Sequence, residues 1–266
     1  MPGFSSISPS QLARLVGTPD CPVLIDIRTE SDFSADPRLI PGAFRHAFDR
    51  IEELAGGLTG KRAVAICQKG QKLSEGAAAL LRCHGVAAES LEGGVLAWAA
   101  EGLPMLPAAT LPGSRLWVTR HRPKIDRIAC PWLIRRFVDA QARFLFVAPS
   151  EVAAVADRFG ATPYDVEGVP FSHRGELCSF DALLDDFCLH TEALDRLALV
   201  VRGADTDRHD LAPQAAGLLA ISVGLSRQYR DDLAQLEAGM AVYDALYRWA
   251  RDGYEEGHDW PATRRA

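Results

Sequence analysis

The stretch of residues 64–74 constrains the fold of this chain more than any other. Residues 64–66 are apolar and partly β-branched, which is typical of a short buried strand. Residues 76–82 are rich in Ala and Leu, a composition that favours a helix. Cys67 is therefore predicted to lie where a strand ends and a short loop turns back into a helix.

A loop of this kind can hold an anion next to the cysteine. Its backbone N–H groups and the amino terminus of the helix form a cradle for anionic groups, and the same field lowers the pKa of a thiol. We therefore predict that Cys67 is a catalytic nucleophile. The predicted anion-binding loop consists of Gln68, Lys69, Gly70, Gln71 and Lys72, with the glycine at the sharp turn and two lysines that add positive charge.

Three further motifs accompany the stretch around Cys67, and together they make residues 5–106 resemble a single rhodanese domain. They are residues 24–28 (LIDIR), 40–43 (IPGA) and 91–94 (LEGG), in the order and spacing of that family. The resemblance implies an α/β fold, with a parallel sheet covered by helices on both faces. It also implies a sulfurtransferase in which Cys67 carries a persulfide, with a small anionic sulfur donor, a thiol acceptor and no required cofactor.

The chain departs from the rhodanese pattern at two positions. Lys72 stands where the family often has Arg, and Leu39 stands where a His often precedes the IPGA motif. Lys is a point charge and cannot grip an oxyanion bidentately as Arg can, so the identity of the sulfur donor stays open. Asp26 and Arg28 end the first predicted strand, and we expect them to support the site as an ion pair at the sheet edge.

Length, charge and cysteine usage bound the remaining possibilities. The 266 residues are enough for two domains, and the net charge of −6 argues against binding nucleic acid or an anionic membrane through bulk charge. Six irregularly spaced cysteines suit a reducing compartment. The N-terminus lacks a signal-like apolar run, and no window approaches about 18 apolar residues. We expect a cytoplasmic protein without a membrane span, and its oligomeric state stays open.

A segment with prolines and a glycine, residues 107–114, is predicted to be a linker that forms neither helix nor strand. It separates a rhodanese-like domain, residues 1–106, from a second domain, residues 115–266. The second domain is expected to be helix-rich α+β. Pro131 is placed in the first turn of a helix, and residues 203–207 are predicted to form a polar loop.

The second domain resembles the C-terminal domain of the chromate-resistance protein ChrB. The stretches that carry the resemblance are residues 119–137, 172–180, 201–206, 212–225 and 243–247. The resemblance implies a role in chromate resistance or sensing, but no catalytic residues. ChrB regulators carry a different N-terminal domain, thought to bind DNA, whereas a rhodanese-like domain occupies that place here.

Positive charge is concentrated in residues 115–143, which hold eight Lys or Arg against two Asp. Arg122, Lys124 and Arg127 are candidate ligands of a dianion such as chromate or sulfate, because Arg and Lys clusters suit oxyanions. The alternative is a solvated basic face, or arginines that pair with acids of the helical half.

A second group of polar side chains could bind a divalent metal, because imidazole and carboxylates are suitable ligands. The candidates are His173, Glu176, Asp205 and Asp207, with His121 or Asp126 as further donors. The alternative is a polar loop that closes a helix bundle. Cys130 and Cys178 are candidates for a thiol site or, as is more usual in apolar helices, buried packing.

Three hypotheses of function remain open at this point. The first is a cytoplasmic sulfurtransferase acting through Cys67 and fused to a domain for chromate or oxyanion stress. The second is a non-catalytic chromate or oxyanion sensor that uses the rhodanese-like domain as a binding or thiol-sensing module. The third is an interaction platform, against which the cysteine at the start of the loop argues.

Overall fold

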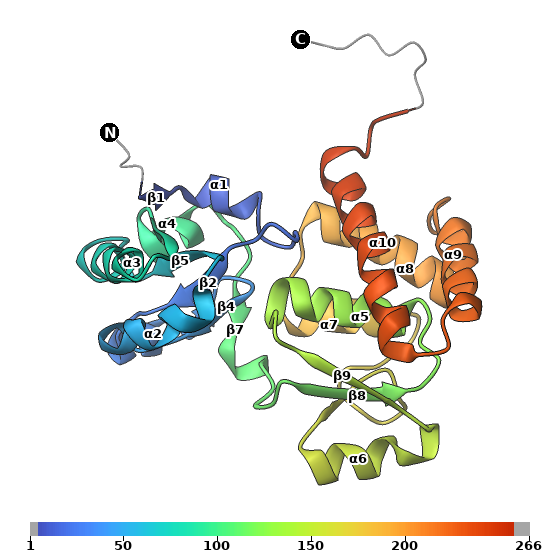
Figure 1. Ribbon diagram of the computed structural model, residues 1–266. Helices are drawn as coiled ribbons and strands as arrows, with labels where there is room; N and C mark the ends of the chain where they lie inside the picture. The colour runs from blue at the N-terminus through green and yellow to red at the C-terminus, as the bar shows by residue number, and fades with distance from the viewer. Residues whose placement is uncertain (1–4, 258–266) are drawn as a thin grey trace.

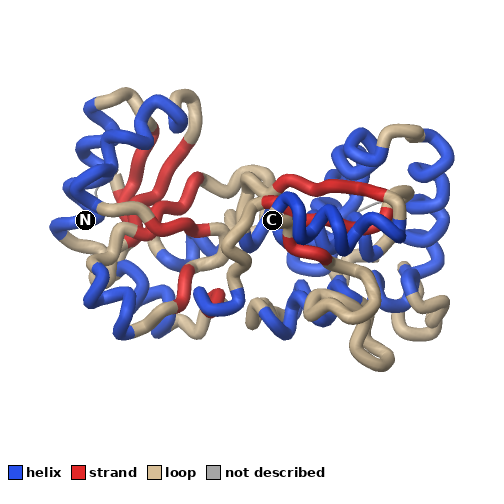
Figure 2. The backbone as a smooth tube through the Cα atoms, turned by 90° about the horizontal axis from the view of Figure 1, so that it is seen from below, coloured by secondary structure: helices blue, strands red, loops and turns tan. Residues whose placement is uncertain are grey.

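The computed structural model describes residues 5–257 as two halves, each built around its own parallel sheet (Figure 1). Figure 2 shows the strands gathered in two groups, one on either side of the connecting segment, residues 107–114. Within the described residues, no helix is both long enough and apolar enough to cross a membrane.

The first half contains a five-stranded sheet in the order β1-β6-β5-β2-β4, in which neighbouring strands are parallel. Its strands are β1 (Ser6–Ile7), β2 (Val23–Asp26), β4 (Ala43–Arg45), β5 (Arg62–Ile66) and β6 (Ala87–Leu91). Its helices are α1 (Pro9–Ala13), α2 (Glu30–Ala35), the 3-10 helix η1 (Phe48–Leu58), α3 (Lys72–Cys83) and α4 (Gly94–Ala100).

Helices cover both faces of this sheet, as predicted. The side chains of β5 alternate between the two faces. Ala63 and Ala65 pack in one cluster with residues of η1 and α3. Val64 and Ile66 belong to the core on the opposite face, which includes residues of α1 and α4. The predicted α/β fold of this half is therefore confirmed.

The connecting segment is more ordered than its composition indicates. Strand β7 (Leu106–Pro107) pairs antiparallel with β3 (Arg38–Leu39), and the 3-10 turn η2 (Ala108–Thr110) follows. The N–H of Ala108 also donates to the carbonyl of Pro37 at 2.9 Å. The prediction of neither helix nor strand was wrong for the first residues of 107–114, because a distant strand supplies hydrogen-bond partners that local composition cannot reveal.

The second half has a three-stranded parallel sheet in the order β10-β8-β9, surrounded by helices. Its strands are β8 (Leu116–Arg120), β9 (Arg143–Val147) and β10 (Thr162–Pro163). Its helices are α5 (Asp126–Leu133), the π-helical η3 (Ile134–Val138), the 3-10 helix η4 (Pro149–Glu151), α6 (Val152–Phe159), α7 (Ser179–Asp186), α8 (Glu192–Asp205), α9 (Ala215–Gln228) and α10 (Asp232–Asp252). The predicted helix-rich character is confirmed.

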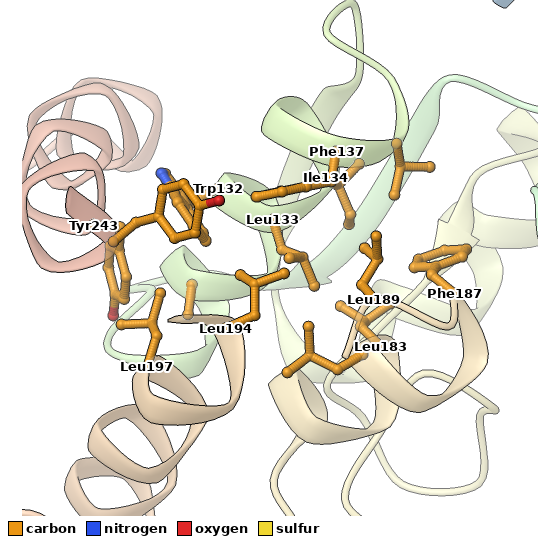
Figure 3. Close-up of a cluster of buried hydrophobic side chains, with 14 of the residues drawn as sticks. Trp132, Leu133, Ile134, Phe137, Leu183, Phe187, Leu189, Leu194, Leu197 and Tyr243 are labelled. Carbon is orange, nitrogen blue, oxygen red and sulfur yellow. The ribbon is translucent and has the colours of Figure 1, made fainter. Parts of the chain in front are cut away.

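The core of this half forms where α5 and η3 meet α7, α8 and α10. Figure 3 shows Trp132 and Leu133 packed against side chains of these helices, including Leu194 of α8 and Tyr243 of α10. Pro131 lies inside α5 and not in its first turn, because the helix already begins at Asp126. Proline lacks an N–H donor, and the chain continues directly beyond it as the π-helical η3.

One further element of the second half, helix α8, differs from the predicted pattern. Helix α8 continues through Asp205, so only the end of the predicted loop 203–207 is non-helical. At Gly203, α8 passes close to the start of α9: a Cβ atom on this residue would lie 3.0 Å from the Ala215 Cβ. The close approach favours glycine at this position, although glycine has a weak helix propensity. The polar composition of the segment hid this packing contact between α8 and α9.

The two halves share one continuous hydrophobic core. The N–H of Gly42 donates to the carbonyl of Phe137 across the boundary at 2.5 Å. The Arg251 guanidinium, on α10, donates to the carbonyl of Arg14 at 3.0 Å. These contacts fix the position of one half relative to the other.

Candidate functional site

Cys67 directly follows β5, which has strand neighbours on both sides. It therefore lies at the carboxyl ends of the parallel strands, where ligands of such sheets usually bind. Residues 67–71, called the Cys67 loop below, lead into α3, which begins at Lys72. The cysteine is 5% exposed. Strand, loop and helix follow the predicted order, and α3 already includes Lys72, the last residue of the predicted anion-binding loop.

The start of α4 holds the Cys67 loop in place. The N–H of Val95 donates to the Cys67 carbonyl at 3.0 Å. A Cβ atom on Gly94 would lie 2.2 Å from that carbonyl oxygen and 2.5 Å from the nitrogen of Gly70. Only glycine fits there, and its φ of +60° also favours glycine. The glycine at the end of the motif 91–94 thus lets the backbone at the start of α4 pack directly against the backbone of the Cys67 loop.

Hydrogen bonds lower the pKa of the Cys67 thiol. Burial alone would raise the pKa, but the Ser74 hydroxyl and the backbone N–H groups of Gln71, Ser74 and Lys69 stabilise the thiolate. Their combined effect outweighs burial, so the pKa lies below the ordinary value of 9.0. The loop therefore provides the amide cradle that the sequence predicts.

The charged side chains of the predicted anion-binding loop lie at its mouth. Lys69, Gln71 and Lys72 are exposed, whereas Gln68 and Gly70 are half-buried. Neither lysine forms an ion pair with another residue of the described chain. Both charges are therefore available to an incoming anion, and their role in binding a sulfur donor stays a prediction.

Asp26 and Arg28 form a buried ion pair, with 2.6 Å between Nη2 and Oδ2. The Arg28 guanidinium also donates to the carbonyls of Asp36 and Arg38 and lies over the Phe33 ring. Each of these contacts ties β2 to the segment that follows it. The expected ion pair is present, and its support of the Cys67 site stays a prediction.

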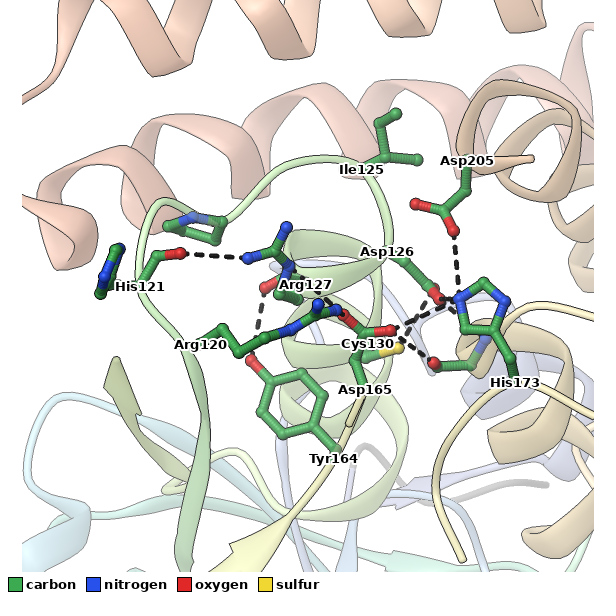
Figure 4. A network of polar contacts seen from close by, with 12 residues as sticks. Arg120, His121, Ile125, Asp126, Arg127, Cys130, Tyr164, Asp165, His173 and Asp205 are labelled. Atoms are coloured by element: carbon green, nitrogen blue, oxygen red, sulfur yellow. Dashed lines mark hydrogen bonds and ion pairs between the residues drawn. The ribbon is translucent and has the colours of Figure 1, made fainter. Parts of the chain in front are cut away.

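The second half gathers a group of acidic side chains around one histidine (Figure 4). His173 Nε2 lies 3.2 Å from an Asp205 oxygen, 3.5 Å from an Asp126 oxygen and 3.5 Å from an Asp165 oxygen. Asp126 begins α5, Asp205 ends α8, Asp165 follows β10, and His173 lies in the loop before α7. These four residues are called the His173 cluster below.

Burial and mutual repulsion raise the pKa values of two carboxyl groups in this cluster. Asp126 is 1% exposed, and burial with the nearby charges of Asp205 and Asp165 raises its pKa well above 3.8. Burial and Asp165 likewise raise the pKa of Asp205, although His173 opposes the shift. A cation bound among these oxygens would relieve the repulsion.

Protein groups compensate only part of the negative charge. The N–H groups of Ser179 and Phe180, at the start of α7, donate to the Asp126 carboxylate at 2.7 and 3.0 Å. Arg120 and Arg127 pair with Asp165 at 3.0 and 3.2 Å. Both arginines therefore pair with Asp165. Among the described residues, Asp126 and Asp205 have no arginine partner and form ion pairs only with His173.

The Cys130 and Cys178 thiols border the His173 cluster without being exposed. Cys130 Sγ donates to Asp126 at 3.4 Å. Burial and the charge of Asp126 raise the pKa of both thiols well above 9.0. Both are therefore neutral at physiological pH and behave as packed core residues, the alternative that the sequence left open.

The structure brings together part of the predicted metal set. One ligand atom each from Asp126, His173 and Asp205 lies within 4.8 Å of the others. Glu176 and Asp207 are exposed and lie outside this set, as does His121, which is exposed near the carboxyl end of β8. Asp165 was not predicted, although its position two residues after β10 is a signal for a site at the carboxyl end of a sheet.

Comparison with known proteins identifies both halves. The family model of the ChrB C-terminal domain matches residues 117–250, half of the chain. The chain belongs to this family. The model of the rhodanese-like domain matches residues 8–101, so a rhodanese-like domain precedes the ChrB-type domain. Both resemblances seen in the sequence are confirmed.

Individual relatives cover one half each. Protein ChrB of Cupriavidus metallidurans is 36% identical over 134 residues, which are 50% of this chain and 40% of that protein. A rhodanese-related protein from Thermoplasma volcanium is 22% identical over 39% of this chain and 98% of its own, with a TM-score of 0.34. A rhodanese-like domain protein from Staphylococcus aureus is 25% identical over 36% of this chain and 91% of its own, with a TM-score of 0.31.

The predicted oxyanion ligands of the ChrB-type domain do not converge on one site. The Arg127 guanidinium pairs with Asp165, as described above, and donates to the His121 carbonyl. Arg122 and Lys124 instead line a cavity of about 220 Å³ together with Arg227. This basic pocket lies beside the end of α9, and its other lining residues are Val223 and Ser226.

The three cations of the basic pocket differ in whether they already have hydrogen-bond or ion-pair partners in the described chain. The Arg122 guanidinium donates to the Ser226 carbonyl at 2.5 Å and approaches the Tyr229 carbonyl at 3.5 Å, so it caps the end of α9. Lys124 and Arg227 are exposed and form no ion pair with the described chain. Two free cations thus remain in the pocket, one of which, Arg227, lies outside the basic segment 115–143.

Proposed function

We propose that this protein is a sulfurtransferase that carries sulfur on Cys67 and acts, through its ChrB-type domain, in chromate or oxyanion stress. One observation supports the first part above all: Cys67 stands in an amide-lined loop whose hydrogen bonds favour the thiolate. A thiolate is the nucleophilic form of cysteine. The ChrB-type domain supports the second part.

The proposed reaction has two steps, each of which exchanges one sulfur bond. With thiosulfate as donor, the Cys67 thiolate attacks the outer, sulfane sulfur. The sulfur–sulfur bond of thiosulfate breaks, and sulfite leaves with its electron pair. The persulfide on Cys67 then passes its outer sulfur to a nucleophile, a thiolate or cyanide, and the Cys67 thiolate is regenerated. The amide cradle holds the anionic groups in both steps.

Substitution of the cysteine tests this function directly. Cys67→Ser should abolish thiosulfate:cyanide transfer, because a hydroxyl has too high a pKa to act as nucleophile without an adjacent base. Mass spectrometry after incubation with thiosulfate should find one added sulfur, on Cys67. Cys83→Ser, at an exposed cysteine of the same domain, is the control and should keep full activity. Full activity of the Cys67 variant would exclude the assignment.

We also propose that the ChrB-type domain binds a divalent cation through Asp126, His173 and Asp205. The residues fit such an ion, because one imidazole and two carboxylates can each offer a ligand atom within 4.8 Å of the others. The cation would supply positive charge where two carboxyl groups repel each other. The role of such an ion in the stress response is part of this proposal.

A second candidate function is a non-catalytic chromate or oxyanion sensor. The basic pocket favours it, since Lys124 and Arg227 have no acidic partner in the described chain. The two candidates differ in one measurement. A sensor would bind chromate but would transfer no sulfur from thiosulfate, whereas a sulfurtransferase transfers sulfur whether or not chromate is present.

We place the protein in the cytoplasm. All six cysteines are free thiols in the structure, and the proposed reaction requires that Cys67 stay reduced. A reducing compartment provides both conditions.

A further inference from the structure

A cavity of about 710 Å³ lies between the two halves. Its walls come from the amino ends of β2 and β5, from β4, from the connecting segment and from the chain after η3. Cys67 follows the opposite, carboxyl end of β5, and neither Cys67 nor the His173 cluster lines the cavity. This interdomain cavity is therefore separate from both sites described above.

The walls of the interdomain cavity are held in place by contacts between the two halves. The hydrogen bond from Gly42 to Phe137 and the one from Arg251 to Arg14 tie the two halves together. The continuous core runs through both halves as well. The walls are thus fixed by packing, and a ligand would meet a site that is already formed.

Much of the wall is apolar, and its size suits a small organic molecule. Its apolar side chains include Leu24, Phe33, Phe44, Leu111, Trp117 and Val138. Cys21 adds a neutral thiol, because burial raises its pKa to about 11 despite the nearby charges of Arg136 and Arg62. Ligand cavities typically have volumes of about 300–1,000 Å³ and similar apolar linings.

The charged groups in the wall are strongly biased toward positive charge. Five cations line it, namely Arg45, Lys61, Arg115, Arg135 and Arg136, against one acid, Asp139. Four of the cations already have a carboxylate partner: Arg115 pairs with Asp139, Arg135 with Glu237, Arg136 with Asp244 and Arg45 with Glu30. Lys61 has no such partner among the described residues, and Arg45 keeps one guanidinium nitrogen without an acceptor.

Arg45 and Lys61 keep hydrogen-bond donors that the described protein does not use. Arg45 Nη2 donates to Glu30 at 2.9 Å, but its Nη1 is shielded from solvent and has no acceptor within residues 5–257. The Lys61 ammonium forms no ion pair there either. A shielded donor without an acceptor costs free energy, which an anion in the cavity would recover.

We propose that the interdomain cavity binds a small organic anion, with its apolar body between the two halves and its anionic group on Arg45 or Lys61. Such a ligand contacts the rhodanese-like half and the ChrB-type half at once. Its binding is therefore linked to the relative position of the two halves. The proposal does not depend on sulfur transfer at Cys67.

The test uses the full chain and the aromatic sulfonate 8-anilinonaphthalene-1-sulfonate as the probe. Calorimetry and probe fluorescence should show one saturable site. Lys61→Met, Arg45→Met and the double variant remove the two charges and keep apolar side chains of similar length. The double variant should bind about tenfold more weakly than the wild type, and at least one single variant should account for most of that loss.

Two controls separate this site from non-specific binding. Arg158→Met removes one positive charge on α6, at an exposed residue far from the cavity wall, and should leave the probe affinity unchanged. The neutral analogue N-phenyl-1-naphthylamine should bind more weakly than the sulfonate, and its affinity should not respond to Lys61→Met. Thiosulfate:cyanide transfer should be the same in Lys61→Met and wild type.

If the double variant binds the sulfonate as tightly as the wild type, or if the neutral analogue competes equally, the cavity has no anion site. Because Lys61 is exposed and unpaired within the described chain, Lys61→Met keeps the fold, and an unchanged thermal unfolding curve verifies this. Loss of probe binding in Arg158→Met as well would show that the probe responds only to net charge.

Discussion

The Ser74 hydroxyl oxygen lies 3.2 Å from the Cys67 sulfur, and it also lies 3.1 Å from the Gln71 carbonyl oxygen. A hydroxyl has one proton to donate. While Cys67 is a thiol, that proton can bind the carbonyl; once Cys67 is a thiolate, the sulfur is the stronger acceptor. The first turn of α3 thus offers the cysteine a hydrogen bond that strengthens on deprotonation.

Ser74→Ala should therefore raise the pKa of Cys67 toward the ordinary thiol value. In the wild type, the rate of Cys67 alkylation by iodoacetamide should rise with pH through a midpoint below 9.0, because the thiolate is the reactive form. The variant should shift this midpoint upward and slow alkylation at neutral pH by up to about tenfold, as expected for a hydrogen bond to a charged group. Alkylation of the exposed Cys83 is the internal control. An unshifted midpoint would mean that the backbone amides alone stabilise the thiolate.

Lys72→Ala should weaken binding of an anionic sulfur donor. The expected rise in the KM for thiosulfate is several-fold, since an exposed single charge contributes about 1 kcal/mol or less. Sulfur release from Cys67 to a neutral acceptor thiol should change less. Arg50→Ala removes an equally exposed charge of the same domain, paired with Glu53, and should leave the KM unchanged. An unaltered KM in Lys72→Ala would assign donor binding to the amides of the Cys67 loop.

Gly94→Ala should disrupt the Cys67 loop, whereas Gly76→Ala should not. The new methyl group at position 94 would meet backbone atoms of Cys67 and Gly70 that cannot move independently. We expect a large drop in thermal stability and loss of sulfur transfer. Gly76 lies inside α3 with nothing within 4 Å of an added Cβ, so alanine there should raise helix stability by up to about 1 kcal/mol. Equal stability of the two variants would contradict the close approach of α4 and the loop.

The fold of the first half follows from local sequence signals. The apolar run before Cys67 and the Ala-rich run after it are short, contiguous patterns, and each is decided by neighbouring residues. The same holds for the capping serine of α1, Ser8, which forms a capping box with Gln11. Where the structure differs, as at β7, the deciding partner lies far away in the chain.

The His173 cluster could be predicted only in part, for a related reason. His173 and Asp205 attract attention as polar residues in polar surroundings, and the structure brings them together. Asp165 was not predicted as a site residue, although its carboxylate lies beside both His173 and Arg127. Glu176 lies three residues from His173 in the sequence, yet it is exposed outside the cluster. Tertiary contacts among α5, α8 and the loop before α7 decide the ligand set, and sequence spacing does not encode them.

Asp205→Asn should weaken divalent metal binding, and Glu176→Gln should not. Calorimetry with Zn²⁺ and with Mn²⁺ on the metal-free wild type should show one equivalent bound. Loss of one carboxylate ligand should lower the affinity by about tenfold or more. Affinity should also fall as the pH is lowered, because the metal must displace a proton from Asp126, whose pKa is raised by burial. If Glu176→Gln has the larger effect, the site contains the ligand set expected from the sequence and not the one in the structure.

Chromate should bind in the basic pocket through Lys124 and Arg227. Both side chains are exposed and unpaired within the described chain, so Lys124→Ala/Arg227→Ala should keep the fold while removing two charges. We expect chromate affinity, measured by calorimetry on the full chain, to fall by about tenfold.

The control for the basic pocket is Arg143→Ala. Arg143 belongs to the same basic segment and is equally exposed, but it does not line the pocket. Its removal should leave chromate affinity unchanged, which separates a local site from the general field of residues 115–143. Wild-type binding should weaken with salt and with added sulfate, because screening and an equally charged competitor both act on an electrostatic site. If the double variant and Arg143→Ala bind chromate as tightly as the wild type, the basic pocket is a structural cap of α9 and holds no oxyanion.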